Sequence, residues 1–236
     1  MFLGVDGAHK NWCCCIIDED LANFQIEVYK DINELYTNIP NFDQLFIDIP
    51  IGLSSTSFSR IIDAEVRKFL PKNRKSSVFT PPCREALNEQ NYKAANLCNK
   101  SITGKGISIQ SWNLSNRILE IDFFLRTHQN LLFKIHESHP ELCFFMLNNQ
   151  QSLLYSKKQT DGVLERVRII LQYLKVSEID FIDNIQVESK IKGIKIDDIL
   201  DAFSLSISAF FWKKNNKRSI FQDNNDACDI PLKIAY

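Results

Sequence analysis

The chain has 236 residues, 44% of them hydrophobic, which suits one domain or one domain with an inserted subdomain. Its 28 basic and 29 acidic residues give a formal net charge of −1. That balance argues against a protein that coats nucleic acid non-specifically, because such binding needs many phosphate contacts. No run approaches the roughly 20 apolar residues that span a bilayer. Seven cysteines without a Cys-x-x-Cys pair favour reduced thiols and a cytoplasmic protein.

The N-terminal stretch predicts a β-hairpin with a carboxylate at the end of its first strand. Residues 2–5 form an apolar run that reaches Asp6, and Gly7 is expected to let the backbone turn. A second β-rich run covers residues 12–17, and residues 24–29 alternate as a third strand would. A buried first strand would hold Asp6 at a fixed point on the sheet.

A second buried strand is predicted at residues 45–47, and it also ends in an acid. Asp48 follows this apolar run, and Pro50 and Gly52 then break the strand. If the strands that end at Asp6 and Asp48 are parallel neighbours, both carboxylates lie at the same edge of the sheet.

Residues 54–128 interrupt the alternation of strands and helices, and we interpret them as a helical insertion. Helices are predicted over residues 59–70 and 84–98, followed by a long helix from about residue 114. The loops between them carry basic side chains that could meet a substrate phosphate: Arg74, Arg84 and Lys105. Lys105 lies between two glycines, but the full spacing of a nucleotide-triphosphate loop is absent.

The last part of the chain adds further acids. A strand over residues 131–135 is followed by His139 and Glu141, and a final helix begins near residue 196. Asp198 and Asp201 are three residues apart near the start of that helix, so they share one face. Its small residues suit close packing on a sheet. Clustered carboxylates repel and need a cation, and oxygen ligands favour Mg²⁺ or Mn²⁺.

These motifs together resemble the domain of unknown function 429 family, whose members are classed as predicted nucleases with a ribonuclease H-like fold. The resemblance implies a sheet with the first strand central and acids at Asp6 and Asp48. The ending Asp198-x-x-Asp201-Ala is also similar to the last helix of Holliday-junction resolvases. The motifs run in order from residue 4 to about 210: Gly4-Val-Asp6-Gly, Ile47-Asp48-Ile-Pro-Ile-Gly-Leu, Arg74-Lys-Ser-Ser-Val-Phe-Thr-Pro-Pro, Thr103-Gly-Lys-Gly-Ile-Ser, His139-Pro-Glu141 and Asp197-Asp-Ile-Leu-Asp201-Ala.

The sequence therefore predicts one α/β domain over residues 1–236, with a ribonuclease H-like mixed sheet flanked by helices and an insertion at about 54–128. The expected function is divalent-metal-dependent hydrolysis of nucleic-acid phosphodiesters, with Mg²⁺ or Mn²⁺ as cofactor. The expected metal ligands are Asp6, Asp48 and Asp201, and Asp198 and Glu141 would complete or orient the catalytic site. Phosphate is expected to contact Lys105, Arg84, Arg74 and His139. Two alternatives stay open: an enzyme that handles nucleotides or small phosphates on the same fold, and a non-catalytic binding module.

Overall fold

The computed structural model describes residues 1–72, 74–215 and 218–236. Its contacts divide the chain into two units. Unit 1 comprises residues 1–48, 134–219 and 235–236, and unit 2 comprises residues 49–133 and 220–234. Both contain helices and strands, which confirms the predicted α/β class.

The sheet of unit 1 is built on β1 (Phe2–Ala8), an almost wholly buried strand. On one side β1 pairs antiparallel with β2 (Asn11–Ile17), which pairs antiparallel with β3 (Phe24–Tyr29). On the other side it pairs parallel with β4 (Gln44–Ile47), and β4 pairs parallel with β5 (Ile135–Glu137). The order β3-β2-β1-β4-β5 makes β1 central and the sheet mixed, as the sequence predicted.

The first hairpin turns later than predicted. Gly7 stays in the ladder opposite Trp12, and the strand continues through Ala8. The turn falls at His9, whose φ of 53° is left-handed. β5 is also shifted from the predicted residues 131–135, because a 3₁₀ turn occupies Gln129–Leu131.

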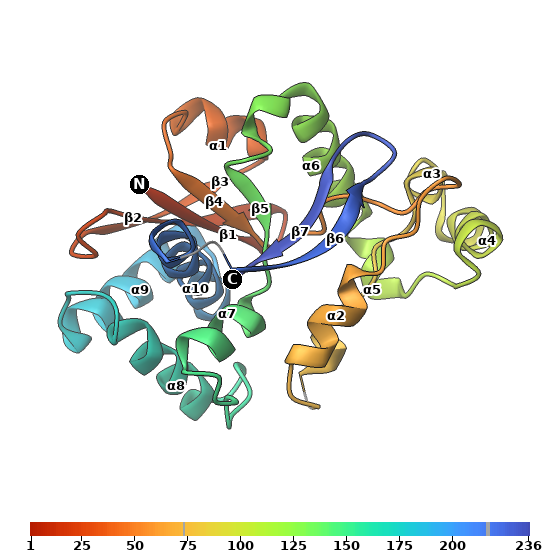
Figure 1. Ribbon diagram of the computed structural model, residues 1–236. Helices are drawn as coiled ribbons and strands as arrows, with labels where there is room; N and C mark the ends of the chain where they lie inside the picture. The colour runs from red at the N-terminus through yellow and green to blue at the C-terminus, as the bar shows by residue number, and fades with distance from the viewer. Residues whose placement is uncertain (73, 216–217) are drawn as a thin grey trace. The chain divides into compact units, whose positions relative to one another are not determined.

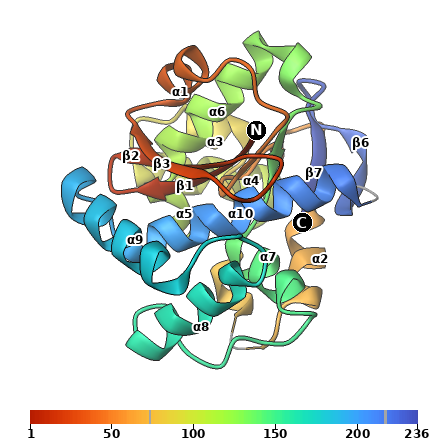
Figure 2. The same cartoon turned by 90° about the vertical axis from the view of Figure 1, so that its left-hand side faces the viewer.

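Helices cover both faces of the unit 1 sheet (Figures 1 and 2). α10 (Ile196–Lys214) lies on β1, β2 and β4, and α1 (Ile32–Asn38) lies on the other face. Three more helices pack against α10. They are α7 (Pro140–Leu147), α8 (Thr160–Leu171) and α9 (Glu178–Lys192).

The contact between β1 and α10 is backbone against backbone. A Cβ placed on Gly4 would lie 2.0 Å from the carbonyl oxygen of Ala202 and 2.3 Å from the amide nitrogen of Ser206. Glycine is therefore required at position 4, because any side chain would push the helix off the strand. The small residues of α10 allow the same approach from the other side, so the predicted packing face is confirmed.

Unit 2 contains the predicted helical segment and a C-terminal hairpin. The predicted helix over 84–98 is two helices, because Asn91 caps a new one by accepting a hydrogen bond from the Ala94 amide. A short 3₁₀ turn covers Lys75–Ser77. The helices are α2 (Ile62–Phe69), α3 (Arg84–Leu87), α4 (Tyr92–Thr103), α5 (Ile109–Asn113) and α6 (Ser115–Thr127).

Residues 220–234 bring most of β6 (Ser219–Asn225) and β7 (Pro231–Ala235) into unit 2. The side chain of Asp226 holds the turn between them by accepting hydrogen bonds from the amides of Cys228 and Ile230. Within the described ranges, every helix is too short or too polar to cross a membrane.

Candidate functional site

Two carboxylates, the buried Asp6 and the partly exposed Asp48, lie side by side at neighbouring strands of unit 1. Asp6 is inside β1, and Asp48 directly follows β4. The parallel ladder continues one step beyond β4, because the Asp48 amide donates a hydrogen bond of 3.0 Å to the Val5 carbonyl. A hydrogen bond also joins the Asp6 and Asp48 side chains. Two carboxylates can share such a bond when one of them carries a proton.

α10 brings a third carboxylate to this pair. Asp201 is 3% exposed and directly precedes Ala202, whose carbonyl oxygen faces Gly4. The close approach of helix and strand therefore fixes where the carboxylate sits. Burial, followed by the charges of Asp48 and Asp201, raises the pKa of Asp6 well above its usual value. These three residues form the carboxylate cluster.

Lys157 supplies a positive charge to the carboxylate cluster. Its Nζ lies 2.6 Å from Oδ2 of Asp201, and its side chain is about one-third exposed. Burial alone would lower the pKa of Lys157, but the charge of Asp201 outweighs it and raises that pKa above its usual value. Burial raises the pKa of Asp201 to about 6, although Lys157 opposes that shift.

A glycine in α8 positions the segment that carries Lys157. A Cβ on Gly162 would lie 1.9 Å from the carbonyl oxygen of Ser156, so only glycine lets this segment pack against the helix. Glycine is unfavourable inside a helix by about 1 kcal/mol relative to alanine. Its presence in the first turn of α8 is explained by this contact.

Glu141 and His139 lie beside the cluster at the start of α7. His139 is the N-cap residue, and its charge lowers the pKa of Asp48, which burial raises overall. Glu141 raises the same pKa, and its Oε1 accepts a bond of 2.7 Å from Nη2 of the fully buried Arg166. Arg166 also donates to the carbonyl oxygen of Gly162. Glu141 is thereby held in place.

Asp198 lies one helical turn before Asp201 and is partly exposed. Burial and then the charge of Asp197 raise its pKa, and its own charge raises the pKa of Asp6. Six of the residues predicted from the sequence therefore interact within unit 1: Asp6, Asp48, His139, Glu141, Asp198 and Asp201.

One observation favours a metal ion at the carboxylate cluster and another does not. Three neighbouring carboxylates with raised pKa values offer hard oxygen ligands and an excess of negative charge, and this suits Mg²⁺ or Mn²⁺. Yet among the described residues no three His, Cys, Asp or Glu side chains are already grouped closely enough to hold a metal ion. In the arrangement observed, the ammonium group of Lys157 is the cation nearest to Asp201.

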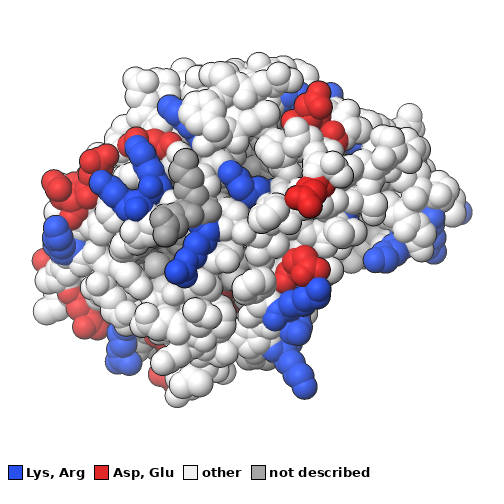
Figure 3. All heavy atoms as spheres, in the orientation of Figure 1, with Lys and Arg blue, Asp and Glu red and all other residues white. Residues whose placement is uncertain are grey.

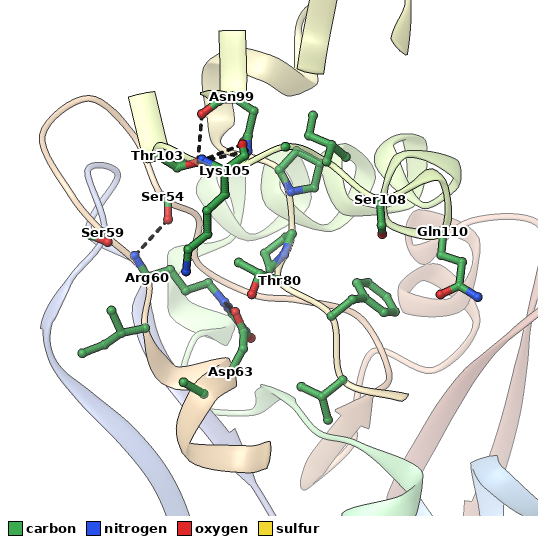
Figure 4. A pocket seen from close by; sticks show the side chains of 18 of the residues that line it. Ser54, Ser59, Arg60, Asp63, Thr80, Asn99, Thr103, Lys105, Ser108 and Gln110 are labelled. Carbon is green, nitrogen blue, oxygen red and sulfur yellow. Dashed lines mark hydrogen bonds and ion pairs between the residues drawn. The ribbon is translucent and has the colours of Figure 1, made fainter. Parts of the chain in front are cut away.

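The remaining predicted phosphate ligands belong to unit 2. Arg84 Nη2 contacts Oδ1 of Asp122 at 2.5 Å and Oδ2 of Asp226 at 2.8 Å, so a phosphate would have to compete with two carboxylates. Arg74 is partly buried beside the 3₁₀ turn. Lys105 is exposed and lines a pocket of unit 2 (Figure 4). Their role as substrate ligands stays a prediction.

Sequence reasoning missed Lys157 and Arg166. Arg166 lies in α8 between Glu165 and Val167, and this local sequence does not distinguish a buried arginine from a surface one. The signal that could have found Lys157 is Gly162, since an unexplained glycine in a helix indicates a close approach by another segment.

Comparison with known proteins identifies the family. A family model described as "Protein of unknown function (DUF429)" matches residues 4–226, which include every residue of the site described above. No curated protein and no solved structure matches the chain. The chain belongs to the domain of unknown function 429 family.

Proposed function

We propose that the protein is a divalent-metal-dependent nuclease of ribonuclease H-like fold, which hydrolyses nucleic-acid phosphodiester bonds at the carboxylate cluster. The observation that carries this proposal is the meeting of Asp6, Asp48 and Asp201 from two parallel strands and one helix, with Asp6 and Asp201 buried and Asp48 partly exposed. The strand order β3-β2-β1-β4-β5, with an antiparallel meander followed by parallel strands, is in keeping with that fold.

Asp6, Asp48 and Asp201 would hold the Mg²⁺ or Mn²⁺ ion. A bound ion of this kind lowers the pKa of its water and stabilises charge on the leaving oxygen of a phosphodiester. Asp198 and Glu141 would orient the site from its rim, and Arg166 keeps Glu141 from moving away.

Phosphate binding would rest on a few local cations rather than on a broad basic surface. Figure 3 shows basic and acidic side chains interspersed on the face that it draws. In unit 1 the side chains of Lys157 and His139 lie beside the cluster. With a metal ion on the carboxylates, Lys157 would be released from Asp201 and could contact a phosphate oxygen.

A specific observation favours a second candidate, a non-catalytic binding module. In the described part of the chain no three potential ligands are grouped for a metal ion, and Lys157 already neutralises part of the cluster. In such a module the acids would be structural, and added metal would change neither stability nor any activity.

The test is a cleavage assay with purified protein on branched, single-stranded and RNA–DNA hybrid substrates, in Mn²⁺, in Mg²⁺ and in chelator. We expect cleavage only with metal, and we expect Asp201→Asn to abolish it. Asp183→Asn is the matched control, because Asp183 is an exposed aspartate of α9 in the same unit. Metal-independent cleavage, or equal activity of wild type and Asp201→Asn, would refute the proposal.

A further inference from the structure

Unit 2 contains a pocket of about 550 Å³, a volume typical of sites for small organic ligands. Its walls come from the segment before α2, from α2 itself, from residues 76–82 and from the α4–α5 loop (Figure 4). None of its lining residues belongs to the carboxylate cluster, which is built in unit 1.

One wall of the pocket is a buried ion pair that is already satisfied. Arg60 Nη2 lies 2.6 Å from Oδ1 of Asp63, and both side chains are almost fully buried. Arg60 also donates from Nη1 to the carbonyl oxygens of Ile51 and Gly52. This pair fixes the wall but leaves no net charge there.

Lys105 presents its ammonium group to the pocket from a fixed backbone. The carbonyl oxygen of Lys105 accepts a bond of 2.8 Å from Nδ2 of the buried Asn99, whose Oδ1 accepts from the amide of Cys83. Two residues further on, the amide of Ile107 donates a hydrogen bond of 2.8 Å to Oδ1 of Asn96. Figure 4 shows the Lys105 side chain extending into the pocket.

The lining of the unit 2 pocket carries more positive than negative charge. Arg67 also lines the pocket and donates to the Val78 carbonyl and the Thr80 hydroxyl, neither of which is charged. Across the part of the chain that the structure describes, neither Arg67 nor Lys105 forms an ion pair. With Arg60 balanced by Asp63, the lining carries two uncompensated cations, and this favours an anionic ligand.

The rest of the lining is mixed, and its apolar part indicates a ligand that carries an apolar group as well as a negative charge. This apolar part includes Val78, Phe79, Pro81, Pro82 and Ile107. An inorganic anion would leave most of the volume and this surface unused. A ligand with a phosphate group and a flat apolar portion would use both, because the ring of Phe79 can pack against such a portion.

We infer that the unit 2 pocket binds a nucleoside monophosphate, either free or as one unit of a strand, with Lys105 contacting its phosphate. This site shares no residue with the carboxylate cluster and does not depend on the nuclease proposal. The base lies against the apolar lining, and Lys105 and Arg67 neutralise the phosphate.

The experiment is isothermal titration of the full chain in chelator with the four ribonucleoside 5′-monophosphates. The same titrations use the nucleosides, ribose 5-phosphate, inorganic phosphate and a hexanucleotide. We expect at least one monophosphate to bind, at least tenfold more tightly than its nucleoside, than ribose 5-phosphate and than inorganic phosphate. Tighter binding of the hexanucleotide identifies a strand as the source of the ligand, and weaker binding identifies the free nucleotide.

Two variants locate the ligand. Lys105→Met should weaken nucleotide binding about tenfold to a hundredfold through loss of a charged hydrogen bond. Ala64→Trp should abolish binding by filling the pocket, since Ala64 is an exposed lining residue that can accept a larger side chain. Lys93→Met is the matched control, because Lys93 is an exposed lysine of α4 outside the lining.

The result separates this site from the carboxylate cluster. Asp201→Asn should bind nucleotide as wild type does, whether or not that variant cleaves any substrate. The inference is overturned if no monophosphate binds, if inorganic phosphate binds as tightly as the nucleotide, or if Lys105→Met binds as tightly as Lys93→Met.

Discussion

Unit 1 and unit 2 each have a lysine at the site that we propose for a phosphate group, but the two lysines are held differently. Lys157 of unit 1 is tied to Asp201 at 2.6 Å, and its charge is used within the protein. Lys105 of unit 2 is fixed through its backbone, and its side chain is exposed. The first lysine compensates a cluster of acids, whereas the second is available to a ligand.

The structures that position these two sites also differ between the units. In unit 1 the acids are positioned by direct packing of α10 on β1, with Gly4 against backbone atoms of the helix. In unit 2 hydrogen bonds with side chains hold the Lys105 loop, and these side chains are those of the buried Asn99, of Asn96 and of Thr103. Substitutions in the first region should therefore change stability, and substitutions in the second should change binding.

The largest effect is expected at the contact between β1 and α10. Gly4→Ala puts a methyl group into space occupied by backbone atoms of Ala202 and Ser206, which cannot rotate away. We expect a loss of about 3 kcal/mol in the free energy of unfolding, measured by urea denaturation.

The matched control is a glycine of unit 2. Gly104 has a φ of +72° but no atom within 4 Å of an added Cβ, so Gly104→Ala should cost only about 1 kcal/mol of backbone strain. Equal losses in the two variants would mean that α10 is not seated on β1 as closely as described.

The second expected effect is a dependence of stability on pH. Burial raises the pKa of Asp201 from 3.8 to about 6, so between these values the folded state binds the proton more tightly than the unfolded state does. The resulting stabilisation is complete below about pH 4 and is lost as the pH rises through about 6.

Asp201→Asn lacks this ionisation. The stability of wild type relative to Asp201→Asn should therefore fall by about 3 kcal/mol between pH 4 and pH 7 in chelator. Denaturation series at several pH values measure this difference. A difference that stays constant over that range would show that Asp201 does not titrate there.

The third expected effect concerns metal. At pH 7 in chelator Asp201→Asn should be at least as stable as wild type, since it removes one of three like charges. Mn²⁺ at a hundredfold excess over its Kd should stabilise wild type by about 2.7 kcal/mol and the variant much less. Thermal melts with chelator and with Mn²⁺ decide this. If the two proteins gain equally, Asp201 is not a metal ligand.

Much of the carboxylate cluster could be predicted because each part has a local signal. An apolar run that ends in an acid and a strand breaker marks Asp48, and three-residue spacing marks Asp198 and Asp201 on one helical face. The small residues of α10 indicated that this helix packs closely on a sheet. These patterns depend on neighbours in sequence, and the parallel pairing of β1 with β4 then brings Asp6 and Asp48 together.

What could not be predicted depends on contacts between distant parts of the chain. Lys157 reaches Asp201 across 44 residues, and Arg84 reaches Asp226 across 142. No spacing rule connects such partners. Glycine favours turns and therefore predicts the hairpin turn at Gly7, but the ladder with β2 continues past Gly7 and the turn falls at His9. There, pairing between strands overrode the local preference.

The smallest effect on stability is expected at Lys105, and it separates the two lysines directly. Lys105→Ala removes a charge that forms no ion pair in the described structure, while the backbone bonds of residue 105 to Asn99 and Thr103 remain. Its unfolding free energy should stay within about 0.5 kcal/mol of wild type, while nucleotide binding weakens.

Lys157→Ala should lower the free energy of unfolding by about 1–2 kcal/mol, because it leaves Asp201 buried beside other acids without its partner. Urea denaturation of the two variants at pH 7 in chelator makes the comparison. If Lys105→Ala loses more than about 1 kcal/mol in the free energy of unfolding, this lysine stabilises the fold of unit 2. That result would contradict a role of its side chain in ligand binding alone.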